Sequence, residues 1–433
     1  MKWHLSEYNL SSKITEENSW VIVNIYKGTV TRMNAALLYA MANLSELPED
    51  TPVLEKLAKQ GLIVDHDERS ALESMARLAC AYPQGIGLTI CPTMGCNFDC
   101  PYCFEDHRPE MMSEKTQDDV IALTEKMLDL SGAKKLSVSW FGGEPLLAAD
   151  IIRSLSERLL DLCEKRDIKY NAGIVTNGYL LDQETVDMLE AAKVSTAQIT
   201  LDGIGKAHDA TRHLAGGGPT FDRITDNLRN VKIPFRVNIR HNVHRENVEE
   251  QKALEKYVKE LAETSGNNLS YYASPVSDNA VAHERGSNVN TLCTEDCSDV
   301  GIKRDVARLT PAMGHYCGAH TLWGVGIDAK GRLHKCWETV DKPERSFGNA
   351  AEWDPQNPIA TASDPDNLTS FLNTAGALDD AECRVCKWLP LCRGGCPNAR
   401  LIRTRNCVPY RDDTDAFVAA VYKAAKERVK AKK

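Results

Sequence analysis

The stretch CNFDCPYCFE, residues 96–105, decides how the rest of the sequence is interpreted. It places Cys96, Cys100 and Cys103 in the spacing Cys-X3-Cys-X2-Cys, directly after the β-prone run GIGLTI. Three thiolates can bind three irons of a [4Fe-4S] cube and leave the fourth iron without a protein ligand. A zinc ion completed by a distant residue is the alternative that this spacing alone leaves open.

Length and composition limit the class of protein. The chain has 433 residues, enough for two or three domains, with 42% hydrophobic and 26% charged residues. A formal charge of -9 argues against a nucleic-acid partner. No apolar run approaches the roughly 20 residues of a membrane span, and no secretory signal is visible, so we expect a cytoplasmic protein without a membrane partner. In a reducing compartment, fifteen cysteines indicate metal ligands better than disulfides.

Strands and helices alternate from residue 86 to about 290. Six such repeats predict an α/β fold, a partial (β/α)6 TIM-like barrel with right-handed crossovers. The expected strands are GIGLTI, KLSVSW, AGIVTN, STAQITL, FRVNIRH and LSYYA, and the expected helices include 113–130, 148–165, 182–192 and 247–263.

The polar and glycine-containing motifs follow the first four of these strands. The cysteine loop comes after the first strand, GGEP (142–145) after the second, TNG (176–178) after the third and TLDG (200–203) after the fourth. Chemistry in such folds is located at the carboxyl ends of the strands. We therefore expect the four segments to share one pocket.

The cysteine loop, continued by Phe104 and Glu105, resembles the cluster motif of the radical S-adenosylmethionine (SAM) enzymes, and GGEP resembles their methionine-binding element. The resemblance implies that SAM binds the open iron, is cleaved by an electron from the cluster, and supplies a 5'-deoxyadenosyl radical that abstracts hydrogen. The same resemblance implies contacts with SAM from Tyr102, Gly142, Gly143, Glu144, Thr176, Asn177, Thr200 and Asp202. Glu144 would accept hydrogen bonds from the methionine ammonium, and Tyr102 would lie against the adenine. The last four residues of that series can also be strand-end caps and turn residues.

Seven cysteines in the last third of the chain form a second pattern. Their spacing resembles the SPASM domain of radical enzymes that modify peptides and proteins, which carries up to two auxiliary [4Fe-4S] clusters. By this resemblance the distal cluster would be bound by Cys383, Cys386, Cys392 and Cys407, and the cluster nearer the active site by Cys317, Cys336 and Cys396. A zinc ribbon is the alternative, although one zinc needs only four ligands.

The nearer cluster is one protein ligand short in this sequence. Either Cys293 or Cys297 completes it, or one iron stays open for a substrate atom such as a cysteine thiolate. An open iron would favour the formation of a sulfur-to-carbon bond.

The N-terminal segment predicts a further small module. Residues 19–64 show a strand, two helices and a strand, the plan of a winged-helix-like unit. Such a unit ahead of a SPASM-type core resembles the precursor-recognition domains of peptide-modifying enzymes, which add a leader peptide to a sheet edge. The predicted domains are 1–85 for this module and its linker, 86–290 for the barrel and 291–433 for the SPASM domain.

These observations lead to one functional hypothesis and two alternatives. The chain is expected to be a radical SAM/SPASM maturase that installs a crosslink, most plausibly a cysteine thioether, in a ribosomally made precursor peptide, with an electron donor such as flavodoxin or ferredoxin. Oxidation of a protein side chain to formylglycine would use the same ligands, and so would carbon-carbon crosslinking or epimerisation. An iron-sulfur or zinc protein that carries electrons or scaffolds a partner is the non-enzymatic alternative, and GGEP argues against it.

Overall fold

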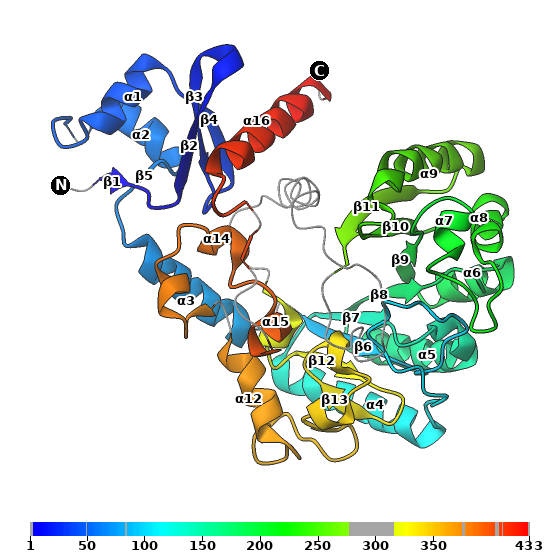
Figure 1. The fold of residues 1–433 in the computed structure, drawn as a ribbon. Helices are drawn as coiled ribbons and strands as arrows, with labels where there is room; N and C mark the ends of the chain where they lie inside the picture. The colour runs from blue at the N-terminus through cyan, green and yellow to red at the C-terminus, as the bar shows by residue number, and fades with distance from the viewer. Residues whose placement is uncertain are drawn as a thin grey trace. The chain divides into compact units, whose positions relative to one another are not determined.

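The computed structural model describes residues 3–48, 50–82, 85–276, 316–374, 377–402, 407–408 and 410–431 (Figure 1). It forms two compact units, each built from separate parts of the chain. The first unit comprises Met1–Ala81, Cys297–His320 and Asn373–Lys433, and the second comprises Tyr82–Asp296 and Thr321–Leu372. The units are therefore interleaved along the sequence, whereas the predicted domains, 1–85, 86–290 and 291–433, were continuous.

The second unit contains a nine-stranded sheet in the order β11-β10-β9-β8-β7-β6-β12-β13-β14. The six predicted strands are confirmed: β6 to β11 are parallel and neighbours in the chain are neighbours in the sheet. This sequential parallel order is the one that right-handed crossovers produce. The six strands are β6 Ile86–Ile90, β7 Lys135–Trp140, β8 Lys169–Thr176, β9 Val194–Thr200, β10 Arg236–Val243 and β11 Leu269–Pro275.

Helices connect these strands, and their ends follow local sequence signals. Ser113 and Asp182 cap α4 and α6 by accepting a hydrogen bond from the backbone N–H three residues on, and Gly132 and Gly266 end α4 and α9 in the left-handed conformation. The helices are α4 Glu114–Ser131, α5 Ala149–Lys165, α6 Gln183–Ala191, α7 Lys206–Asp209, α8 Phe221–Asn230 and α9 Gln251–Ser265.

Three short strands that the sequence did not predict extend the sheet beyond β6. They are β12 Gly324–Ile327, β13 Arg332–His334 and β14 Gly348–Asn349. β12 pairs in parallel with β6, from Gly324 opposite Gly87 to Ile327 opposite Ile90. The helix α12, Pro365–Asn373, follows these strands. Because β12 adjoins the strand that leads into the cysteine loop, the segment after β13 belongs to the same unit as that loop.

The first unit contains a three-stranded antiparallel sheet, β2-β3-β4, and a two-stranded ribbon, β1-β5. The predicted strand near residue 20 is β3, Ser19–Asn24, and both predicted helices are present as α1 and α2. β2, Asn9–Ile14, was not predicted because one of its three buried positions is Ser12, so NLSSKI shows no alternation of apolar and polar residues. The other elements are β1 His4–Leu5, β4 Thr29–Arg32, α1 Ala35–Ala42, α2 Pro52–Lys59, β5 Ile63–Val64 and α3 Glu68–Ala81.

The C-terminal segment completes the core of the first unit. Trp388, Tyr410 and Phe417 are buried against one another, with ring centroids 4.6 to 5.2 Å apart. They join the buried residues of β2 and β3 in one hydrophobic cluster. The helices of this segment are α13 Ala381–Arg384, α14 Leu389–Cys392, α15 Pro397–Ile402 and α16 Thr414–Ala431. Across the described residues, no helix is both long and apolar enough to cross a membrane.

Burial of His241 on β10 predicts a pH-dependent loss of stability. Its side chain is fully buried, and this burial lowers its pKa from 6.5 to about 4. On acidification, His241 of the unfolded chain is protonated near pH 6.5, whereas in the folded chain it stays neutral down to about pH 4. The free energy of unfolding therefore falls as the pH drops from 6.5 toward 4. At pH 5 this one group lowers the free energy of unfolding by about 2 kcal/mol.

The variant His241→Asn keeps a polar atom near the hydroxyl of Tyr271, which lies 2.9 Å from Nδ1 of His241. We expect its free energy of unfolding to fall about 2 kcal/mol less than that of the parent between pH 7.5 and pH 5, measured by urea unfolding of the metal-free protein. The control is His66→Asn, at a half-exposed side chain, for which we expect the same fall in the free energy of unfolding as in the parent. If the free energy of unfolding of His241→Asn depended on pH as that of the parent does, burial of His241 would not be the cause of the loss of stability.

Candidate active site

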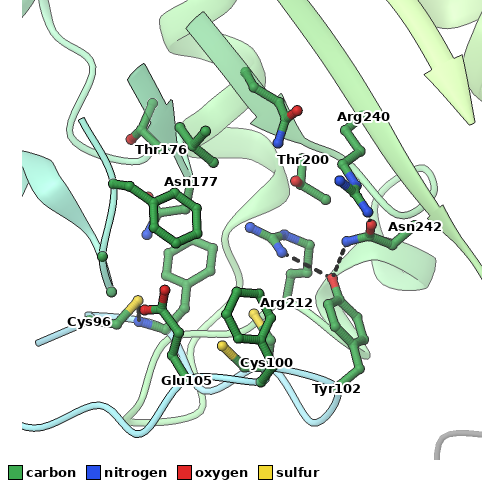
Figure 2. A pocket seen from close by; sticks show the side chains of 18 of the residues that line it. Cys96, Cys100, Tyr102, Glu105, Thr176, Asn177, Thr200, Arg212, Arg240 and Asn242 are labelled. Carbon is green, nitrogen blue, oxygen red and sulfur yellow. Dashed lines mark hydrogen bonds between the residues drawn. The ribbon is translucent and has the colours of Figure 1, made fainter. Parts of the chain in front are cut away.

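A pocket lies at the carboxyl ends of the parallel strands, and the cysteine loop forms one of its walls (Figure 2). The loop contributes Cys96, Cys100 and Cys103 to the lining. Residues of the other three motifs line the same pocket, as the sequence analysis predicted. Residues at or just after the carboxyl ends of β7, β8 and β9 form the opposite side. The described residues that line the pocket are Cys96, Phe98, Cys100, Tyr102, Cys103, Phe104, Glu105, His107, Phe141, Gly142, Gly143, Val175, Thr176, Asn177, Gln198, Thr200, Arg212, Arg240, Asn242, Val276, Trp337 and Glu338.

Backbone hydrogen bonds from two other segments hold the cysteine loop in place. The N–H of Glu144 donates to the carbonyl of Gly95 at 2.8 Å, and the N–H of Ala215 donates to the carbonyl of Asn97 at 2.9 Å. The side chain of Asn177 adds a third link, because its Nδ2 lies 2.7 Å from Oδ1 of Asn97. The loop is thus tied to the ends of β7 and β8 and to the segment after α7.

Gly142 and Gly143 permit a close approach between backbone segments of this chain. Gly142 has a φ of +106°, and a Cβ atom on it would lie 2.3 Å from the carbonyl oxygen of Thr93. A Cβ on Gly143 would lie 2.3 Å from the carbonyl oxygen of Gly95. A side chain at either position would push the GGEP segment away from the cysteine loop. The predicted close approach to SAM stays a prediction.

We expect Gly143→Ala to displace the cysteine loop. The atoms that the new methyl group meets belong to the backbone, which cannot move aside as a flexible side chain can. The free energy of unfolding should fall by about 2 kcal/mol, and iron bound by the purified, reconstituted protein should fall by about four per chain. Gly216→Ala is the matched control, since nothing lies within 4 Å of its added Cβ. If Gly143→Ala bound as much iron as the parent, a side chain at this position would not displace the cysteine loop.

The carboxylate of Glu144 is fully buried and accepts three hydrogen bonds from the chain itself. The donors are the backbone N–H of Leu146 at 3.0 Å, the hydroxyl of Thr176 at 2.7 Å and the backbone N–H of Asn177 at 2.7 Å. Burial raises the pKa of this carboxyl group, and the hydrogen bonds oppose that shift. Glu144 therefore connects the ends of β7 and β8, and its predicted contact with an ammonium group stays a prediction.

Tyr102 stands at the centre of a polar network on the other side of the loop. Its hydroxyl accepts from Nη1 of Arg212 at 3.0 Å and from Nδ2 of Asn242 at 3.2 Å (Figure 2), and it donates to Oδ2 of Asp202. Burial is the main cause that raises the pKa of this phenol well above 10. The hydroxyl is thus fixed by three partners, while the side chain still borders the pocket.

Asp202 was predicted to contact SAM directly, but its carboxylate is fully buried and is not among the described residues that line the pocket. Its Oδ1 accepts the backbone N–H of Asn242 at 3.0 Å, and its Oδ2 accepts from Tyr102 and, at 3.4 Å, from Thr211. The structure therefore places Asp202 behind the wall, where it positions Tyr102. Thr176, Asn177 and Thr200 do line the pocket, as expected.

The pocket also contains polar residues outside the predicted set of SAM contacts, among them Arg212, Arg240 and Asn242. Arg212 follows α7, whereas Arg240 and Asn242 lie at the carboxyl end of β10. Nε of Arg240 donates to Oδ1 of Asn242 at 2.6 Å. The strand-end rule that selected the first four motifs also applies to the fifth strand, so the sequence did contain a signal for the β10 pair.

Aromatic side chains form another part of the wall. The rings of Phe104 and Phe141 are stacked 6.4 Å apart, and those of Phe141 and Trp337 are stacked 5.4 Å apart. Phe104 directly follows Cys103, whereas Trp337 follows β13, in the part of the chain assigned to the SPASM domain from sequence. This aromatic stack gives the pocket an apolar face.

The three thiols of the loop line one pocket, as three ligands of an iron-sulfur cube would. Burial raises the pKa of Cys96 to about 12, and it also raises the pKa of Cys100 and Cys103, so these thiols stay protonated until a metal binds. Nowhere in the described ranges do three His, Cys, Asp or Glu side chains converge tightly enough for one metal ion. A cube binds each thiolate to a different iron, which allows a wider separation of the sulfurs.

A second pocket, in the first unit, brings together four of the C-terminal cysteines. Its lining includes Cys383, Cys386, Cys392 and Cys407, the set that the resemblance implied for the distal cluster. Burial raises the pKa of Cys392 to about 11. Four thiols around one small pocket could hold a [4Fe-4S] cube. We call this site the distal pocket.

The cysteines implied for the nearer cluster are divided between the units. Cys317 and Cys396 belong to the first unit and Cys336 to the second, so their convergence on one cluster stays a prediction. Cys396 is not among the described residues that line the distal pocket. Cys293 and Cys297 lie outside the described residues.

The fold and this site define an α/β protein with a three-cysteine loop at the carboxyl end of its first parallel strand. The sequence model of the radical SAM superfamily matches residues 90–271. Residues 90–271 thus form a radical SAM domain, as the cysteine loop and the GGEP segment predicted.

Among curated proteins, the chain is similar to a cysteine-type anaerobic sulfatase-maturating enzyme of Clostridium perfringens, with 29% identity over 154 residues, 33% of this chain and 40% of that protein. It is also similar to the radical SAM cyclopropyl synthase TigE of Paramaledivibacter caminithermalis, with 28% identity over 153 residues, 32% of this chain and 30% of that protein. The matches to these two curated relatives thus span less than half of their length.

Solved structures share the fold over more of the chain. The structure titled native anSMEcpe with bound AdoMet and Cp18Cys peptide superposes with a TM-score of 0.59 at 19% identity and covers 80% of this chain and 99% of that one. Streptococcus suis SuiB bound to S-adenosylmethionine gives a TM-score of 0.52 at 18% identity and covers 94% of this chain and 99% of that one. These likenesses establish the fold.

Proposed function

We propose that the chain is a radical SAM maturase that crosslinks a ribosomally made precursor peptide, with a cysteine thioether as the product. The observation that carries the proposal is the pocket in which the three thiols of the cysteine loop, the GGEP segment and the ends of the strands meet. When bound there, a [4Fe-4S] cluster and SAM would supply a 5'-deoxyadenosyl radical that takes a hydrogen atom from a peptide carbon.

The chain's own residues would bind and orient these groups. Cys96, Cys100 and Cys103 would hold the cluster, and Tyr102, Thr176, Asn177 and Thr200 would contact SAM. Arg212 offers a buried cationic group on the same wall, which suits a carboxylate. The stack of Phe104, Phe141 and Trp337 would keep water from the radical.

The distal pocket would hold an auxiliary cluster through its four cysteines, and Cys317, Cys336 and Cys396 would hold the nearer one. An auxiliary cluster gives the electron released during bond formation a place to go. If the nearer cluster keeps an open iron, that iron would bind the thiolate of the substrate cysteine. If Cys293 or Cys297 closes it, the thiolate would react without iron.

A peptide substrate is supported by two observations. The solved structure of anSMEcpe contains a peptide together with AdoMet. In the first unit, β4 pairs with β3 on one side only among the described strands, so its other edge can accept a leader strand. The winged-helix-like module would then select the precursor, and flavodoxin or ferredoxin would supply electrons.

Mass spectrometry of a cysteine-containing peptide encoded near the gene tests the proposal. The peptide is incubated with reconstituted protein, SAM and reductant without oxygen, and then alkylated. Loss of two hydrogens together with protection of a cysteine from alkylation would support the thioether. A peptide that loses two hydrogens yet is still fully alkylated would rule the thioether out and favour a carbon-carbon crosslink.

Side-chain oxidation is the second candidate, favoured by the similarity to a sulfatase-maturating enzyme. Formylglycine carries an aldehyde in place of the cysteine thiol. A modified peptide that reacts with a hydrazide probe would therefore establish this reaction in place of the thioether.

A further inference from the structure

Two arginine side chains donate hydrogen bonds to sulfur atoms of the distal pocket. Nη1 of Arg411 lies 3.4 Å from Sγ of Cys407, and Nη1 of Arg400 lies 3.6 Å from Sγ of Cys383. A thiolate accepts such bonds far better than a neutral thiol, because the donor is charged and the acceptor then carries the opposite charge. Two of the four sulfurs that would bind the cluster therefore have a cationic donor in place.

The two arginines differ in their surroundings. The side chain of Arg400 is only 8% exposed, and its Nη2 lies 3.5 Å from a carboxylate oxygen of Asp379 and of Asp380. Asp380 also caps α13 through the backbone N–H of Cys383 at 3.1 Å. Arg400 is thus fixed from both sides, while Cys407, the partner of Arg411, is exposed to solvent.

We propose that Arg400 and Arg411 raise the reduction potential of the iron-sulfur cluster in the distal pocket, an inference that rests on the cluster assigned there under the proposed function. One-electron reduction adds a negative charge to a cluster that four thiolates already make negative. A guanidinium group and its N–H···S bonds stabilise the reduced form more than the oxidised form, which raises the potential. The two arginines would thereby make the distal cluster a better acceptor for an electron.

Redox titration followed by electron paramagnetic resonance tests this inference. The parent is the full chain with Cys96, Cys100 and Cys103 all replaced by Ala, which removes the signal of the cluster bound by the cysteine loop. Iron content is measured first. We expect Arg400→Gln and Arg411→Gln each to keep the parental iron content and to shift one signal to a more negative potential, with a larger shift in the double variant.

Ionic strength separates the two contributions. Salt screens charges that face solvent far more than buried ones. We expect added salt to reduce the shift caused by Arg411→Gln and to leave that of Arg400→Gln nearly unchanged. Arg411→Lys, which keeps the charge without the planar fork of donors, should shift the potential less than Arg411→Gln.

Arg384→Gln is the matched control within the same segment. Arg384 lies next to Cys383 in sequence, but its guanidinium group pairs with Glu73 at 2.9 Å. It should leave the potential unchanged. If Arg400→Gln and Arg411→Gln both kept the parental iron content and the parental reduction potential, the role given to the two arginines would be wrong, while the distal cluster would still stand. If replacement of Cys383, Cys386, Cys392 and Cys407 together by Ala removes no iron relative to the parent, the distal cluster itself is absent, and the proposed function loses that cluster as well.

Discussion

We expect Cys100→Ala to abolish cleavage of SAM, so that 5'-deoxyadenosine falls to the background seen without protein. Cys100 lines the pocket together with Cys96 and Cys103, and a cube held by two thiolates has lost one of its three ligands. Iron should fall by about four per chain. Chromatography of the reaction mixture and iron analysis of the same sample measure both quantities.

Cys163→Ala is the control for this variant. Cys163 lies on α5, is buried in the hydrophobic core of the same unit and has no place in either pocket. Its replacement should leave iron and 5'-deoxyadenosine at the parental values. If Cys100→Ala still cleaved SAM at a rate near that of the parent, the three-cysteine loop would not be the site of the radical chemistry.

The second large effect is expected for Cys392→Ala, in the distal pocket. This variant should retain part of the SAM cleavage, because the cysteine loop is intact, but it should form no crosslinked peptide. The distal cluster then keeps only three of its four cysteine ligands, so the released electron lacks the intact auxiliary cluster that would receive it. Peptide mass and 5'-deoxyadenosine are measured in one reaction.

Cys80→Ala tests whether any cysteine of the same unit would have this effect. Cys80 lies on α3, outside the distal pocket as far as the structure describes its lining. It should support parental product formation. Equal loss of cleavage and of product in Cys392→Ala would contradict the separate roles given to the two cysteine sets.

The parallel strands could be predicted because each one combines a β-prone apolar run with a motif at its carboxyl end. KLSVSW before GGEP is an example: Leu136, Val138 and Trp140 are all buried. The strands β12 to β14 could not be predicted in this way. They are two to four residues long, and β12 gains its place from pairing with β6, a contact between distant parts of the chain.

The residues of the pocket likewise divide into those that the sequence could predict and those that depend on contacts between distant parts of the chain. Because parallel strands end on one side of a sheet, the strand-end rule led to three cysteines and to Thr176, Asn177 and Thr200, all of which line one pocket. Sequence could not separate Asp202, which lies behind the wall, from Thr200, which lines it, because that difference depends on hydrogen bonds to Tyr102 and Asn242. Trp337 joins the wall through the pairing of β12 with β6, for which the sequence held no local signal.

Transfer of deuterium from a labelled precursor peptide to 5'-deoxyadenosine is the most direct test of a radical SAM enzyme that acts on a peptide. The wild-type chain, reconstituted with iron and sulfide, is incubated anaerobically with SAM, reductant and a peptide deuterated at its carbon positions. The account predicts 5'-deoxyadenosine that carries one deuterium. Unlabelled 5'-deoxyadenosine, formed alongside a peptide that has nonetheless been crosslinked, would contradict it.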